Sequence, residues 1–179
     1  MLIQIDKLKR RPRQIAIDEQ AVDFLLLRDL IDQGTVTFNE KICGSLEVAR
    51  VGDIIEVSGR LKTTVTSLCS RCLTPVTDRV ELPVMLCYAG VDDGDEAPVA
   101  EEVEIQTEEL GLISFSGNEI DLRPDLGQEI VMAMPQRSLC REACQGLCPV
   151  CGNNLNKGQC DCESPVFHAG LAALKNFKV

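Results

Sequence analysis

Aromatic side chains and histidine are scarce in this sequence. Its 179 residues include no tryptophan, one tyrosine, five phenylalanines and one histidine. RNA-binding modules that stack bases need several exposed aromatic rings, so we do not expect a stacking platform of that kind. Hydrolytic and nucleophilic mechanisms usually need a base, and the one histidine, His168, lies far in sequence from every pair of cysteines. We therefore expect a protein that is not an enzyme, and any contact with RNA would be mainly electrostatic.

Several other sequence signals are missing. The chain has no glycine-rich phosphate loop, no dinucleotide-binding fingerprint and no nucleophile elbow. No apolar run reaches the roughly 18 residues that a membrane span needs. The segment Met1–Lys7 lacks the apolar region of a secretory signal. These absences predict a cytoplasmic protein that neither enters a membrane nor acts on a small-molecule substrate.

Cysteine, in contrast, is abundant, and eight of the ten cysteines form close pairs in the sequence. In a reducing compartment, closely paired cysteines indicate metal-bound thiolates more than disulfides. Zinc is therefore the expected cofactor. Cys43 and Cys87 stand alone in strand-like sequence, and we expect them to be small apolar core residues. The four pairs are Cys69/Cys72, Cys140/Cys144, Cys148/Cys151 and Cys160/Cys162.

The most specific metal-binding motif is Cys148-Pro149-Val150-Cys151-Gly152. The glycine allows a tight backbone curl that brings both thiolates to about 2.3 Å from one ion. Residues 138–165 show no apolar periodicity, so they need some other source of order. Structural zinc contributes an apparent free energy of roughly 10–16 kcal/mol in small finger peptides, which is enough to order such a segment. Sites made only of cysteines are typically closed, so we expect the metal to hold structure and not to catalyse.

The motif Cys69-Ser70-Arg71-Cys72 is weaker by itself. Zinc ligands, a redox pair and structural thiols in a turn are all compatible with it. A thioredoxin-type pair belongs at a strand-to-helix junction, whereas β-like sequence continues here on both sides.

The number of ions follows from how the pairs combine. We favour two ions, of which one is bound by Cys148, Cys151, Cys160 and Cys162, and the other by Cys69, Cys72, Cys140 and Cys144. The alternative is one ion bound among the six C-terminal cysteines, with the 69/72 pair empty.

The formal net charge of −10 is unevenly distributed along the chain. Residues 7–13 are strongly basic, whereas residues 92–109 hold nine acidic residues and no lysine or arginine. Because charges are screened over about 8 Å at physiological salt, local patches matter more than the total. The basic residues are candidates for contact with RNA or a partner, although ordinary solvated charges would look the same. The candidates are Lys7, Lys9, Arg10, Arg11, Arg13, Arg71, Arg141 and Lys157.

Hydrophobic periodicity predicts an α+β fold. Apolar residues alternate over residues 35–88, which indicates antiparallel strands in a sheet that is either open or barrel-like. Apolar residues recur every four positions over residues 121–134, which predicts an amphipathic helix packed on that sheet. The apolar run in residues 13–32 fits a short helix or a buried strand, and we favour the helix.

The same pattern divides the chain into two parts. Residues 1–135 are expected to form the α+β domain, with an acidic loop at about 92–109. Residues 136–179 are expected to form a cysteine-rich segment held by zinc, followed by a short helix near 166–178.

Several of these motifs together resemble the YceD family of bacteria and plastids. The resemblance covers most of the chain in order. It implies a role in the accumulation of large-subunit (23S) ribosomal RNA, through its synthesis, processing or stability, with no catalytic activity established. The residues that carry it are Cys69-Ser-Arg-Cys72-Leu-Thr-Pro-Val76, Glu119-Ile-Asp-Leu122 with Gln128-Glu-Ile130 and Met134-Pro135, the run from Leu139 to Gly152, Asn154-Leu-Asn156, Cys160-Asp-Cys162 and Leu171-Ala-Ala-Leu-Lys175.

Two other functions remain open. An adaptor or chaperone for a basic ribosomal protein would make better use of the acidic residues 92–109 than direct RNA binding would. A thiol redox protein that uses the 69/72 pair is the third hypothesis.

Overall fold

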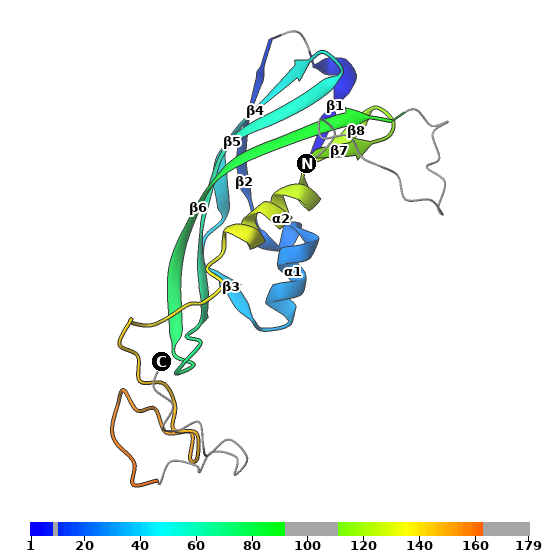
Figure 1. Cartoon of the computed structure of the whole chain (residues 1–179). Coiled ribbons are helices and arrows are strands. Elements are labelled where there is room, and N and C mark those ends of the chain that lie inside the picture. Colours follow the sequence, from blue (N-terminus) through cyan, green and yellow to red (C-terminus); the bar gives the residue numbers. More distant parts are fainter. Residues whose placement is uncertain (9–10, 92–110, 163–179) are drawn as a thin grey trace, which may run out of the picture. The chain divides into compact units, whose positions relative to one another are not determined.

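The chain forms two compact units in a computed structural model that describes residues 1–8, 11–91 and 111–162 (Figure 1). The sheet unit consists of Met1–Ser67 and Thr77–Gln136. The cysteine unit consists of Leu68–Val76 and Arg137–Val179. The short segment that contains the pair Cys69/Cys72 therefore groups with residues more than 60 positions later in the chain.

The main sheet of the sheet unit is open and mostly antiparallel. Strand β4 pairs antiparallel with both β2 and β5, and the short β3 also pairs antiparallel with β5. Only residues 69–74 join β5 to its neighbour β6, and so short a connection requires the two strands to run in opposite directions. Strand β7 pairs parallel with the end of β6. The strands are β2 (Arg13–Glu19), β3 (Val36–Phe38), β4 (Ile42–Val51), β5 (Ile54–Leu68), β6 (Pro75–Gly90) and β7 (Leu112–Phe115), in the order β2-β4-β5-β6-β7.

This sheet confirms the α+β class and the strands predicted between residues 35 and 88. Strands β2 and β7 lie at the two ends of the described order, so the sheet does not close and the barrel-like form does not occur there. The sharp reversal between β4 and β5 occurs at Gly52, whose φ of +64° lies in the left-handed region that glycine tolerates best.

Two α-helices lie on the same side of this sheet (Figure 1). They are α1 (Leu25–Asp32) and α2 (Arg123–Ala133). Two short 3-10 helices, η1 (Ile5–Lys7) and η2 (Ala21–Asp23), precede α1. A separate two-stranded antiparallel sheet pairs β1 (Leu2–Gln4) with β8 (Glu119–Asp121).

The apolar run within residues 13–32 is mainly helical, as we favoured, and a strand that we did not predict precedes it. The helix that we favoured begins only at Leu25, and the preceding residues form β2. In β2, Ile17 is buried and Ile15 half-buried, while the residues on either side of Ile17 are exposed. That alternation is the pattern of a half-buried strand, but it is too short to stand out from the helical run that follows.

The predicted amphipathic helix is confirmed as α2. Leu122, Leu126 and Ile130 are fully buried and belong to the same core as Phe24, Leu27 and the inward side chains of β4, β5 and β6. Burying each leucine or isoleucine side chain contributes about 1.5–3 kcal/mol. The hydroxyl of Tyr88 on β6 donates a 2.6 Å hydrogen bond to the carboxylate of Asp125, which further ties α2 to the sheet.

Some expectations lie outside the described residues. These are the acidic stretch 92–109, Lys9, Arg10, His168 and the helix near 166–178. Cys43 and Cys87 are half-buried and lie on β4 and β6. None of the helices within the described part of the chain is both long and apolar enough to cross a membrane.

Candidate metal centres

Eight cysteines gather in two groups of four within the cysteine unit. Their sulfur atoms lie within 4.8 Å of one another in each group, so each group could hold a metal ion. These groups contain the same residues as the two sets that we favoured from the sequence. The first centre comprises Cys69, Cys72, Cys140 and Cys144, and the second comprises Cys148, Cys151, Cys160 and Cys162.

The sulfur spacing of the first centre matches four ligands around one ion. The sulfur atoms of Cys69 and Cys144 are 3.9 Å apart, and those of Cys72 and Cys140 are 3.6 Å apart. A tetrahedron with metal–sulfur bonds of about 2.3 Å has edges of about 3.8 Å. A disulfide would instead require about 2.05 Å. The arrangement therefore suits a tetrahedral thiolate site.

The two Cys-x-x-Cys motifs form the same kind of turn. The backbone N–H of Leu73 donates to the carbonyl of Cys69 at 2.9 Å, and the N–H of Gly152 donates to the carbonyl of Cys148 at 2.9 Å. Both donors have positive φ angles, +59° for Leu73 and +72° for Gly152. Glycine adopts this conformation without strain, whereas a leucine rarely does. The Cys69–Cys72 motif thus forms the same turn as the Cys148–Cys151 motif, although it is followed by a leucine and not by a glycine.

Backbone N–H groups around the first cysteine of each motif favour a thiolate there. Backbone N–H donors, of Cys140 first and then of Arg71 and Cys72, lower the pKa of Cys69 to about 6. The N–H groups of Cys151 and Val150 likewise lower the pKa of Cys148 to about 6. The lowered pKa of both thiols favours the thiolate, which is the form that binds metal.

Other cysteines in the same centres resist ionisation. Desolvation and the neighbouring thiols raise the pKa of Cys140 to about 12. The hydrogen bond with Cys151 is the main cause that raises the pKa of Cys162 to about 12. Like charges this close together disfavour one another. A divalent cation would remove that conflict and allow all four thiolates to form.

The first centre is better enclosed than the second. Cys69, Cys72 and Cys144 are buried and form a small cluster with Val76, Leu139 and Leu147 packed against it. In the second centre Cys148 is buried, Cys160 is half-buried, and Cys151 and Cys162 are exposed. The linker between the centres contains Gly146, at φ +79°, where a side chain would approach the carbonyl of Arg71 to 3.1 Å. Glycine therefore permits the close passage of these two segments.

Two candidate contact residues form hydrogen bonds inside the cysteine unit. The guanidinium of Arg71 donates to the carbonyl oxygens of Glu142 and Cys144 at 3.0 and 2.9 Å. The guanidinium of Arg141 donates to the side-chain oxygen of Asn156 at 2.7 Å. These arginines therefore hold the loops around the first centre together, a role that we did not expect from the sequence.

The other candidate residues are distributed over both units. Lys7 lies in η1, Arg11 precedes β2, and Arg13 begins β2, all with exposed side chains in the sheet unit. Lys157 is exposed in the cysteine unit.

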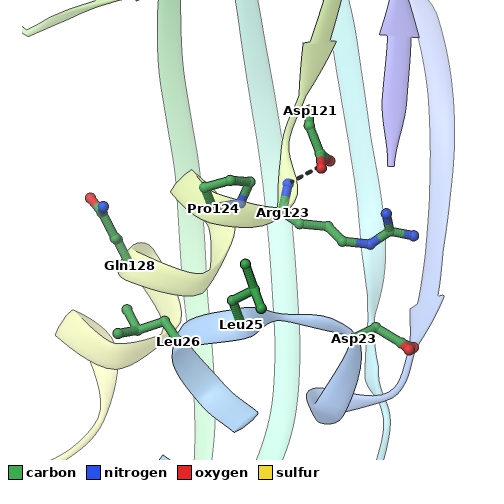
Figure 2. Close-up of a pocket in the computed structure, with 7 residues that line it drawn as sticks. All are labelled: Asp23, Leu25, Leu26, Asp121, Arg123, Pro124 and Gln128. Atoms are coloured by element: carbon green, nitrogen blue, oxygen red, sulfur yellow. Dashed lines mark hydrogen bonds between the residues drawn. The ribbon is translucent and has the colours of Figure 1, made fainter. Parts of the chain in front are cut away.

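The sheet unit has a pocket of about 300 Å³ between α1 and α2. Figure 2 shows Leu25 directed toward the first turn of α2, where Pro124 lies. The guanidinium of Arg123 donates to Glu19 at 2.9 Å, and its backbone N–H donates to Asp121 at 3.2 Å. The polar groups of this pocket thus stabilise the start of α2, and we assign it no ligand.

The fold and the two centres define a small α+β protein with a cysteine-rich unit able to hold metal. Residues 57–178 match the family described as Large ribosomal RNA subunit accumulation protein YceD. The chain belongs to the YceD family, which confirms the resemblance seen in its motifs. The family's name describes an accumulation factor and not a catalyst.

Two mycobacterial proteins are similar to the chain. An uncharacterized protein of Mycobacterium tuberculosis is 30% identical over 123 residues, which cover 68% of this chain and 53% of the relative. An uncharacterized protein of Mycobacterium leprae is 26% identical over 155 residues, covering 87% of this chain and 67% of the relative.

A plant protein is also similar. The large ribosomal RNA subunit accumulation protein YCED homolog 1, chloroplastic, of Arabidopsis thaliana is 24% identical over 152 residues, covering 75% of this chain and 47% of the relative. The chain thus spans about half the length of several curated relatives that it matches. No solved structure matches the chain significantly.

Proposed function

We propose that this chain is a non-enzymatic, cytoplasmic factor that supports the synthesis, processing or stability of 23S ribosomal RNA during ribosome biogenesis. Two structural zinc ions, one in each centre, hold its cysteine unit in the form that binds its target. The name of the family supports the proposed role in the accumulation of large-subunit ribosomal RNA. The observation that carries the metal proposal is the pair of four-cysteine groups in a segment with few apolar residues.

Zinc suits these donor sets better than other common metals. Soft thiolates in a tetrahedral arrangement select zinc or iron–sulfur clusters, whereas magnesium and calcium prefer oxygen ligands. Closed sites with four thiolates leave no position for a reactive water. The zinc ions therefore stabilise the fold and do not take part in a reaction.

Direct contact with RNA would use the exposed lysine and arginine side chains. Phosphate contacts from such residues supply affinity without sequence readout. Lys157 in the cysteine unit and Lys7, Arg11 and Arg13 in the sheet unit are the described candidates with exposed side chains. Lys9 and Arg10 complete the basic stretch in the sequence. Arg71 and Arg141 act mainly by holding the cysteine unit together.

The alternative is an adaptor or chaperone for a basic ribosomal protein. Nine acidic residues between positions 92 and 109 favour it, because they would attract a basic partner and repel RNA. A thiol redox function is less well supported. Cys69 is fully buried and Cys72 nearly so, whereas thiol exchange requires an accessible sulfur.

The test replaces the native protein in cells with Cys148→Ser/Cys151→Ser, using Cys87→Ser as the matched control because Cys87 lies in neither centre. We expect the double variant to lower the ratio of large-subunit to small-subunit ribosomal RNA and the control to leave it unchanged. An unchanged ratio in a double variant that has lost zinc would contradict the proposal.

Ultraviolet crosslinking then separates the two mechanisms. Direct recovery of 23S RNA supports RNA contact, and recovery only through a protein supports the adaptor.

A further inference from the structure

The loop between the two cysteine pairs of the second centre reaches the first centre. It contains Asn154 and Asn156. The side-chain nitrogen of Asn156 lies 3.3 Å from the sulfur of Cys144. The same nitrogen donates to the side-chain oxygen of Asn154 at 2.8 Å. A ligand of one centre thus receives a hydrogen bond from a loop whose ends are ligands of the other.

The partners of Asn156 fix the orientation of its amide group. Its side-chain oxygen accepts from the backbone N–H of Gln145 at 3.0 Å and from the guanidinium of Arg141 at 2.7 Å. Both of these groups can only donate. The oxygen must therefore face them, and the NH₂ group must face Cys144 and Asn154. With two donors and two acceptor positions in use, Asn156 is fully satisfied in this one orientation.

A second path connects the same loop to the first centre. The side-chain nitrogen of Asn154 lies 3.4 Å from the hydroxyl of Thr74, and the thiol of Cys72 lies 3.3 Å from that hydroxyl. Backbone hydrogen bonds support the path, because Leu155 donates to Gly146 at 3.0 Å and Leu147 donates to Arg71 at 3.1 Å. Two of the four sulfur atoms of the first centre therefore have neighbours that depend on the shape of this loop.

We propose that Asn156 is a positioning residue that couples the two centres, so that metal bound at the second centre raises the affinity of the first. The inference rests on the proposed metal binding at both centres. A metal at the second centre holds the two ends of the loop and so holds Asn156 against Cys144. Its N–H then donates to the Cys144 sulfur and holds that ligand in place for the metal of the first centre. By linkage, metal at the first centre raises the affinity of the second by the same factor.

The test measures the coupling with cobalt(II), whose charge-transfer absorption reports thiolate ligation. Cobalt affinity is measured for the full chain, for Cys151→Ser/Cys162→Ser, which leaves only the first centre, and for Cys72→Ser/Cys140→Ser, which leaves only the second. The coupling factor is the overall two-metal affinity of the full chain divided by the product of the two single-centre affinities. We expect it to be about 10- to 100-fold, the usual effect of groups that hydrogen-bond a metal ligand.

The decisive variant is Asn156→Asp, which keeps the acceptor oxygen that faces Arg141 and Gln145 and replaces the NH₂ donor group with a second oxygen. We expect its coupling factor to fall close to one. Asn153→Asp adds the same charge at the exposed position that precedes Asn154 and should retain the coupling. If Asn156→Asp fails to fold, Thr74→Val provides a second variant, because it removes only the shared hydroxyl and should reduce the coupling partially.

The outcomes separate this inference from the proposed function. A full chain that binds no cobalt or zinc would remove the proposed metal centres and the coupling with them. Two bound metals with a coupling factor of one would overturn the coupling and leave the centres intact. Coupling that persists in a folded Asn156→Asp variant would show that Asn156 does not carry it; if that variant does not fold, unchanged coupling in Thr74→Val would count against the role of the loop.

Discussion

The guanidinium of Arg71 donates a hydrogen bond to the carbonyl oxygen of Cys144 at 2.9 Å. It also donates to the carbonyl of Glu142, so one side chain joins the first Cys-x-x-Cys turn to the segment that carries Cys140 and Cys144. These two halves of the first centre are about 70 residues apart in sequence. A side chain therefore joins the two halves of this centre.

Replacing Arg71 should weaken the first centre. In Arg71→Lys the charge remains, but the ammonium group differs in reach and geometry from the planar guanidinium, whose Nη1 donates to both carbonyl oxygens. We expect a loss of about 1–2 kcal/mol in the stability of the cysteine unit, since a hydrogen bond from a charged group contributes about 1.5–3 kcal/mol before exposure reduces it. In a competition experiment with a chelator, the weaker centre should release its metal at a lower chelator concentration. Arg137→Lys, an exposed position in the same unit, is the control, and equal effects in both variants would argue against this role.

Leu73 and Gly152 offer a reciprocal pair of substitutions. Leu73→Gly should leave metal binding intact and stabilise the cysteine unit by up to about 1 kcal/mol, because it removes the strain of a left-handed leucine. Gly152→Leu should lower the stability of the cysteine unit by about 1–2 kcal/mol, because the leucine would have to adopt a positive φ angle. A steric clash is not the reason, since a Cβ there would meet no atom within 4 Å. Thermal unfolding of the metal-loaded chain measures both effects. A destabilised Leu73→Gly would indicate that the leucine side chain, 56% exposed, makes contacts more important than its backbone strain.

Metal removal should affect the two units differently. The sheet unit has a large apolar core, whereas the buried cluster of the cysteine unit consists of three cysteines with three half-buried residues around them. We expect a strong chelator to abolish hydrogen-exchange protection at the backbone N–H groups of Leu73, Cys148 and Gly152, while β4 and β5 remain protected. Protection that survives complete metal removal in the cysteine unit would refute a structural role for the metal.

The Tyr88–Asp125 pair predicts a pH dependence of the sheet unit. Burial, followed by the hydrogen bond to Asp125 and its charge, raises the pKa of Tyr88 above its usual range. A raised pKa in the folded state means that the neutral phenol stabilises the fold below the unfolded pKa of about 10. This contribution is lost as the pH rises above that value, so the sheet unit should weaken in strong alkali.

Tyr88→Phe tests this relationship. The substitution should remove the part of the destabilisation in alkali that comes from ionisation of the phenol. At neutral pH it should lower the free energy of unfolding by about 1–3 kcal/mol, because the hydrogen bond to a carboxylate disappears. Urea unfolding at pH 7 and above pH 10 measures both effects. Since Tyr88 is the only tyrosine, the ultraviolet absorbance of tyrosinate reports its ionisation directly. Ionisation near pH 10 in the folded protein would contradict the raised pKa.

Local patterns in the sequence were sufficient for much of the fold. Alternating apolar residues predicted β3 to β6, and the four-residue repeat predicted α2. Each of these elements buries one face, so the spacing of its apolar residues along the sequence indicates whether it is a strand or a helix. Where two patterns met within 20 residues, at β2 and α1, the longer apolar run hid the shorter strand. The parallel pairing of β7 with β6 was also missed, since partner and direction are not properties of a single segment.

The cysteines that could hold metal can be picked out from the order of residues alone, since paired thiols, their spacing and the shortage of apolar residues around them are all local features. What surrounds those thiols depends on the folded arrangement of the chain. In the folded chain, Leu73 adopts a left-handed backbone conformation that glycine adopts more easily. Arg71 and Arg141 donate hydrogen bonds that hold loops together, and Asn156, from the loop between the cysteine pairs of the second centre, donates to Cys144 of the first. Hydrogen bonds between distant segments depend on where the backbone brings them, and that geometry has no signature in the order of the residues.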